Sequence, residues 1–165
     1  MMEKFVKGID TFSKLGAYLS ALCMLAIVSL IVVEIVCRTF FNFSTFIADE
    51  YSGYLMVAAV LAGLGFTLES GSHIRISILT AKLSPEPKRY LELVATLVAV
   101  SITTFIFYHA VLMVYDTYSY GMLADSISET PLYIPQIMVA VGLFGLVLQL
   151  LAQFVRRLPF CSRNH

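Results

Sequence analysis

Glu34 and Arg38 are the first residues in this sequence whose types and spacing indicate chemistry. They stand four residues apart, in the order that favours an ion pair along one helix. An apolar stretch precedes them and a short aromatic stretch follows. The pair therefore predicts a charged end to an apolar helix, where the two side chains either neutralise each other or contact a second protein.

Asp49 and Glu50 open the next apolar stretch. Carboxylates in the first turn of a helix interact favourably with the positive end of the helix dipole. Ser44 or Thr45 can cap that helix, because hydroxyl oxygens accept hydrogen bonds from its free backbone N–H groups. The short turn between the two stretches brings the four charged side chains to one rim of the molecule.

His109 is the one ionisable residue inside an apolar stretch, which raises the question of a haem ligand. Bis-histidine ligation would need a second histidine within such a stretch, and His73 and His165 both lie outside them. The cysteines show no C-x-x-C spacing of the kind found in redox and zinc sites: Cys23, Cys37 and Cys161. We therefore expect no cofactor in this chain.

The composition is that of a membrane protein. Of 165 residues, 59% are hydrophobic and 13% are charged, and the mean hydropathy is +0.84, whereas about a quarter of the residues in an ordinary globular domain are charged. Eleven basic and eleven acidic residues give a net charge of zero, which excludes a nucleic-acid-binding surface. The fold class predicted is all-α, with four transmembrane helices in a single membrane domain.

The predicted spans are apolar segments about as long as a hydrocarbon core requires, which is roughly 20 residues. None contains an internal proline, because all five prolines fall in loops or near the start of a span. We expect continuous helices with these bounds: span 1 at 15–38, span 2 at 46–69, span 3 at 91–115 and span 4 at 131–155.

Two further segments are predicted to lie at the membrane surface. In residues 1–14, apolar side chains fall on one helical stripe and charged ones on the other, as in an amphipathic interfacial helix. Residues 71–89 are expected to form a cytoplasmic loop with a short interfacial helix. Ten of the eleven Lys and Arg residues lie on the side of the two termini, so we expect both termini to be cytoplasmic.

The first half of the chain carries a series of short motifs in a fixed order. They are Glu34 and Arg38, Phe41-Asn42, Ser44, Asp49-Glu50, Tyr54-Leu55, Gly63, Gly65, and Gly71-x-His73-Ile74. By their order and spacing, they resemble the small membrane subunit, or Q subunit, of tripartite ATP-independent periplasmic (TRAP) transporters.

The resemblance implies a bacterial inner-membrane subunit that braces a much larger, elevator-type membrane subunit and is not an enzyme. It implies that a periplasmic binding protein delivers an organic anion, such as a four-carbon dicarboxylate or a sialic acid, and that sodium drives its uptake. Sodium binding is then expected in the large subunit. The residues expected to contact partners are Glu34, Arg38, Asp49, Glu50, Gly63, Gly65 and His73.

The residues support an accessory role without the resemblance. Substrate sites in secondary transporters are built from broken helices, and no span here is interrupted by proline. Ala58, Ala59, Ala62, Gly63 and Gly65 form a small-residue face that lets another helix approach, with an internal neighbour as the default. The alternative is a small four-helix multidrug-type exporter, although Glu34 lies near the edge of its span and not at mid-span.

Overall fold

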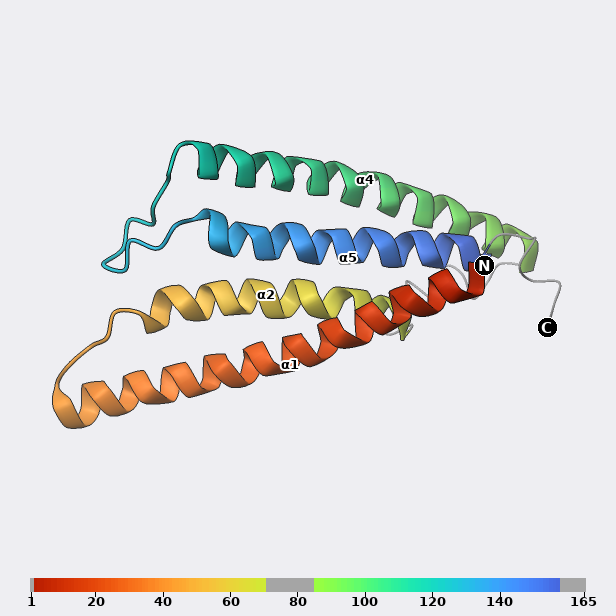
Figure 1. Cartoon of the computed structure of the whole chain (residues 1–165). Helices are drawn as coiled ribbons and strands as arrows, with labels where there is room; N and C mark the ends of the chain where they lie inside the picture. The colour runs from red at the N-terminus through yellow and green to blue at the C-terminus, as the bar shows by residue number, and fades with distance from the viewer. Residues whose placement is uncertain (1, 71–84, 158–165) are drawn as a thin grey trace.

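The computed structural model describes residues 2–70 and 85–157 and contains four long helices (Figure 1). These are α1 (Met2–Phe41), α2 (Ala48–Glu69), α4 (Pro85–Ser119) and α5 (Tyr133–Arg157). Strands are absent from the described part, which has one isolated antiparallel bridge between Leu123 and Pro131. All four helices are long and apolar enough to cross a membrane. The predicted all-α class with four spans is confirmed.

α1 and α4 contain predicted spans 1 and 3 and extend beyond them, whereas α2 and α5 each begin two residues after the predicted start of spans 2 and 4. α1 runs for 40 residues without a break, so the predicted interfacial segment 1–14 is helical and continuous with span 1. α4 begins at Pro85, six residues before the predicted span, because a proline is well suited to the first turn of a helix. The interfacial helix predicted within 71–89, with His73, falls largely on residues 71–84, outside the described residues.

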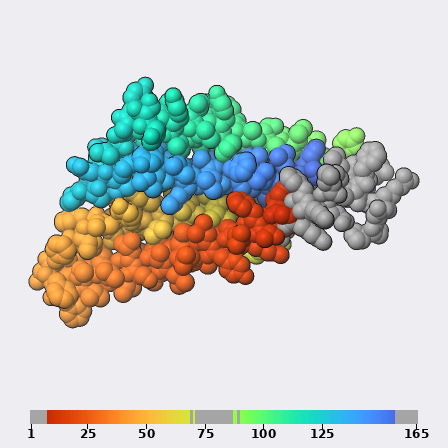
Figure 2. All heavy atoms as spheres, in the orientation of Figure 1, coloured from red at the N-terminus to blue at the C-terminus, as the bar shows by residue number. Residues whose placement is uncertain are grey.

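The four helices lie in a row in the order α1, α2, α5, α4 (Figure 1). α1 packs along α2, α2 packs on α5, and α5 packs on α4, while α1 meets α5 less extensively. The space-filling view has the same order, with α4 and α1 at opposite edges (Figure 2). The row leaves many large apolar side chains exposed, as expected where lipid or another membrane protein covers them.

Small residues set the distances between the helices. At Gly16 a Cβ atom would lie 2.5 Å from the carbonyl oxygen of Ala62, and at Gly142 it would lie 2.5 Å from Leu61 Cβ. These glycines therefore mark where α1 crosses α2 and where α5 crosses α2. Cys23 is buried with small side chains of α2, chiefly Ala58 and Ala59.

The small-residue face of α2 packs against α1. Cβ atoms placed at Gly63 and Gly65 would lie 3.2 Å from Ser20 Oγ and 3.1 Å from Ser13 Oγ. The default expectation of an internal neighbour is confirmed. Gly63 and Gly65 were also expected to contact a partner, and in the structure their small-residue faces lie against α1 of the same chain.

Candidate functional site

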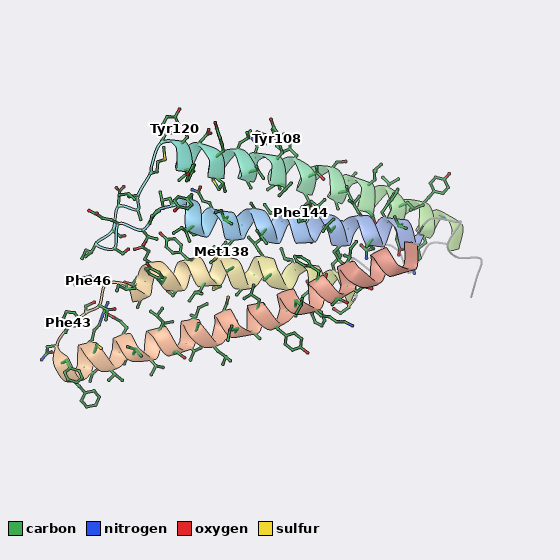
Figure 3. All side chains as sticks on the ribbon, in the orientation of Figure 1. Phe43, Phe46, Tyr108, Tyr120, Met138 and Phe144 are labelled. Atoms are coloured by element: carbon green, nitrogen blue, oxygen red, sulfur yellow. The ribbon has the colours of Figure 1, made fainter. Side chains whose placement is uncertain are left out.

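The predicted charged rim lies at the end of the molecule where α1 leads into α2 and α4 leads into α5. We call it the loop end and define it as residues 34–54 and 116–134. Figure 3 shows Phe43 and Phe46 in the first connection and Tyr120 beside the second. Asn42 ends α1 with φ +49°, a left-handed conformation that asparagine adopts more readily than most residues. The chain thereby turns back towards α2.

Glu34 is the centre of the first hydrogen-bonded cluster. Its side chain is only 8% exposed and accepts hydrogen bonds from Arg38 Nε at 2.7 Å and Ser44 Oγ at 2.7 Å. Its other oxygen accepts from the backbone N–H of Thr45 at 3.1 Å and from the Thr45 hydroxyl. One carboxylate at the end of α1 therefore holds the connection to α2.

The predicted ion pair between Glu34 and Arg38 is confirmed, and the predicted cap of α2 is wrong. The residue at the N-cap is Ile47, which makes no side-chain capping bond. Ser44 and Thr45 lie too far ahead of the helix, and their hydroxyls donate to Glu34 instead. Asp49 and Glu50 are in the first turn, where their charges compensate for the missing cap.

Phe46 adopts φ +56° between the Glu34 cluster and α2. A bulky residue rarely adopts this conformation, and it persists only where the surrounding structure fixes the backbone. Thr45, which is bound to Glu34 through its N–H and its hydroxyl, supplies that constraint on one side. On the other side the first turn of α2 holds Ile47.

Glu50 is the centre of a second cluster that fixes the connection from α4 to α5. Tyr54 on the same helix donates to Glu50 Oε1 at 2.7 Å. The hydroxyl of Ser128 donates to Glu50 Oε2. Thr130 lies 2.9 Å from the Ser128 hydroxyl and 3.2 Å from the Tyr51 hydroxyl, so α2 contacts this connection through two of its side chains.

The connection also has backbone hydrogen bonds of its own. The N–H of Ala124 donates to the carbonyl of Thr130 at 2.9 Å, and the N–H of Leu132 donates to that of Met122 at 3.1 Å. A short antiparallel turn results, and Glu50 attaches it to α2. The two glutamates therefore act as separate anchors, one for each connection, and not as one four-residue charge cluster.

Two predicted site residues keep exposed charge at the loop end. The Arg38 side chain is 55% exposed and lines a shallow hollow of about 310 Å³ with Asn42, Phe43, Ser44 and Phe46. Asp49 is exposed, and its carboxylate makes no hydrogen bond or ion pair with the described residues. Of the four charged residues predicted to form the rim, Arg38 and Asp49 are thus the two that remain accessible to another molecule.

Sequence reasoning missed a polar cluster near the opposite end. Gln149 is the most completely buried large side chain in the described part, at 1% exposed. Its Oε1 accepts from Ser13 Oγ at 3.1 Å and its Nε2 donates to Asp10 Oδ1 at 3.4 Å. The available signal was that Gln149 is the single amide within residues 137–152 of α5, which are otherwise apolar. This cluster links the first turns of α1 to α5.

The cavity between α1, α2 and α5 is apolar. Its volume is about 350 Å³, and the hydrogen-bonding groups among the side chains that line it are the Ser13 hydroxyl and the weakly polar Cys23 thiol. A charged solute would lose its hydration there without compensating hydrogen bonds. In the described ranges, no group of three or more His, Cys, Asp or Glu side chains is placed to hold a metal ion.

Comparison with known proteins identifies a family. Residues 27–160 match the model of the DctQ component of tripartite ATP-independent periplasmic transporters. A candidate TRAP transporter small permease protein of Haemophilus influenzae is 26% identical over 144 residues, which are 87% of each chain. The ectoine TRAP transporter small permease protein TeaB of Halomonas elongata is 28% identical over 91% of this chain and 78% of its own. No solved structure matches the chain.

Proposed function

The chain belongs to the DctQ component family of TRAP transporters and is thus a small membrane transport subunit and not an enzyme, and on this premise we propose that it braces a large, elevator-type membrane subunit. The geometry that supports this role is the pair of anchors at the loop end. Glu34 and Glu50 fix both connections between helices, which gives a stiff row of four helices for a moving partner to work against.

We place the loop end on the periplasmic side of the inner membrane. Ten of the eleven basic residues lie towards the termini and the α2–α4 connection, and basic residues are retained on the cytoplasmic side. In a chain freed of its native cysteines, an impermeant thiol reagent added outside should label a cysteine at Asp125 and spare one at Lys88. The reverse labelling pattern would overturn this orientation.

The transported solute is a small organic molecule that a periplasmic binding protein delivers and a sodium gradient drives inward. A four-carbon dicarboxylate or a sialic acid is the expected class, and ectoine, which appears in the name of one relative, is the alternative. The apolar cavity of this subunit is unsuited to all of them. Substrate and sodium therefore bind in the large subunit.

Arg38 and Asp49 are the residues that we assign to contact with the binding protein. They keep exposed charge at the proposed periplasmic end, while Glu34 and Glu50 are occupied by hydrogen bonds within the chain. Held as it is by four donors, Glu34 is also unsuited to the proton exchange that a multidrug-type exporter needs. We therefore drop the exporter alternative.

Reconstitution tests the proposal. Affinity purification of the tagged chain from its native membrane should recover a large membrane subunit. In liposomes with an inward sodium gradient, uptake should require that subunit and the binding protein, with labelled succinate, sialic acid and ectoine as the solutes tried. Sodium-driven uptake by this chain alone, or recovery of no large membrane protein, would contradict the bracing role.

A further inference from the structure

The face of α4 that is turned away from α5 carries polar groups at membrane depth. The buried side of α4 includes Thr96, Ala110 and Thr117, and the residues half a turn away on the helix form the opposite face. The residues of this opposite face are exposed. We call this the outer face of α4. It includes Ser101, whose hydroxyl donates to the Leu97 carbonyl of its own helix, and also Phe105, Tyr108, His109, Leu112 and Asp116.

His109 is the most informative residue on the outer face of α4. It lies six residues inside the predicted end of the span at residue 115, or about 9 Å along the helix. Its ring meets the edges of Phe105, at 4.5 Å between centroids, and Tyr108, at 5.5 Å. Neither its imidazole nor the Tyr108 hydroxyl makes a hydrogen bond within residues 2–70 and 85–157. Figure 3 shows Tyr108 on the side of α4 away from α5.

The exposed surfaces of the other three helices differ from this face. Within residues 15–33 of α1, the exposed polar side chains are Tyr18 and Ser29, and Ser29 Oγ donates to the carbonyl of Leu25 in its own helix. Within residues 51–68 of α2 and 133–155 of α5, the exposed side chains are apolar apart from Tyr51 at the start of α2. Tyr18 stands only three residues inside the predicted start of span 1, where a tyrosine hydroxyl can reach the membrane–water interface. Those surfaces therefore suit lipid.

An imidazole and a phenol facing hydrocarbon without partners are unfavourable, and ionisable residues in membranes normally face protein or water. Lipid chains offer no hydrogen bond to either group. A helix of another protein does, and polar side chains between membrane helices commonly make such bonds. The outer face of α4 therefore needs a protein neighbour that supplies a hydrogen-bonding group at the depth of His109.

We propose that the outer face of α4 is the surface that docks against a transmembrane helix of the large subunit, with His109 hydrogen-bonded to a polar side chain of that helix. This inference rests on the proposed function and adds the location of the contact. It puts the large subunit beyond α4, at the opposite edge of the row from α1 (Figure 1). Charge complementarity further implies a basic or hydrogen-bond-donating group of the partner near Asp116.

Photocrosslinking in native membranes tests the location. A benzophenone amino acid at Phe105, which is 64% exposed, should form an adduct with the large subunit. The matched control is the same amino acid at Leu25 of α1, which is 67% exposed and should give no such adduct. An adduct from Leu25 alone, or from Phe105 only with a second copy of this chain, would overturn the inference and leave the bracing role standing.

Substitution of His109 tests the hydrogen bond. His109→Leu should lower the amount of large subunit recovered per tagged chain by about threefold to tenfold, the range expected for one hydrogen bond between membrane helices. His109→Gln, which keeps hydrogen-bonding groups, should recover most of the loss, and Tyr18→Leu on α1 should change nothing. Unchanged recovery with His109→Leu would overturn the proposal. Failure of the unaltered chain to recover any large subunit would overturn the bracing role as well.

Discussion

Gly142→Ala is expected to force apart α2 and α5, the two central helices of the row. The added Cβ would lie 2.5 Å from Leu61 Cβ and 3.3 Å from the Leu61 carbonyl carbon, whereas carbon atoms in contact are about 3.5–4.0 Å apart. Because the Cβ of Leu61 is fixed to its backbone, α5 would have to move away from α2 by roughly 1 Å. Overpacking of this kind costs about 1–3 kcal/mol.

Gly53→Ala in α2 is the matched control, because a Cβ there meets nothing within 4 Å. Both substitutions gain up to about 1 kcal/mol in helix propensity, so this gain cancels when the two variants are compared. We expect the free energy of unfolding of Gly142→Ala to be about 2 kcal/mol lower than that of Gly53→Ala. In soluble chains of this length such a difference lowers Tm by about 4–8 °C.

Cys23 provides the assay. It is buried against α2 at 7% exposed, so in a Cys37→Ser and Cys161→Ser background a thiol-reactive dye should label it only when the protein unfolds. The temperature of half-labelling in detergent then reports Tm for each variant. Equal values for Gly142→Ala and Gly53→Ala would refute the close crossing of α2 and α5 and the stiff row that depends on it.

Three other predictions concern the polar clusters. Glu50→Gln should speed amide hydrogen exchange in residues 122–132, because the carboxylate that attaches this connection to α2 is lost. Ser13→Ala and Gln149→Leu should each lower the free energy of unfolding, with a coupling of about 0.6–1.7 kcal/mol in the double-mutant cycle. Arg38→Ala should reduce sodium-driven uptake at limiting binding protein and leave the recovery of the large subunit unchanged, because three other donors still hold the first connection.

Each of these has a control or a contrary outcome. Asp49→Asn should leave hydrogen exchange in the α4–α5 connection at the level of the unaltered chain, because Asp49 takes no part in the Glu50 cluster. Additive effects of Ser13→Ala and Gln149→Leu would mean that their hydrogen bond contributes nothing to stability. If Arg38→Ala instead causes loss of the large subunit, the rim of α1 contacts that subunit and the assignment to the binding protein is wrong.

The sequence alone was sufficient for the four spans and for the Glu34–Arg38 pair. Long uncharged runs predict membrane helices because a buried backbone must satisfy its own hydrogen bonds in lipid. A spacing of four residues brings two side chains together on any helix, whatever else surrounds it. Both signals are local, so they survive without knowledge of the tertiary structure.

The hydrogen-bond partners of Glu50 and Gln149 depended on the tertiary structure. Glu50 and Ser128 are 78 residues apart, and Gln149 and Ser13 are 136 apart, so no local pattern could pair them. Only the packing of α2 and α1 against α5 decides which serine or threonine meets each polar group. The tertiary structure likewise decided that Gly63 and Gly65 face α1 and that the polar outer face of α4 faces away from the chain. A helix's own sequence could not settle either point, because it does not specify which neighbour covers each of its sides.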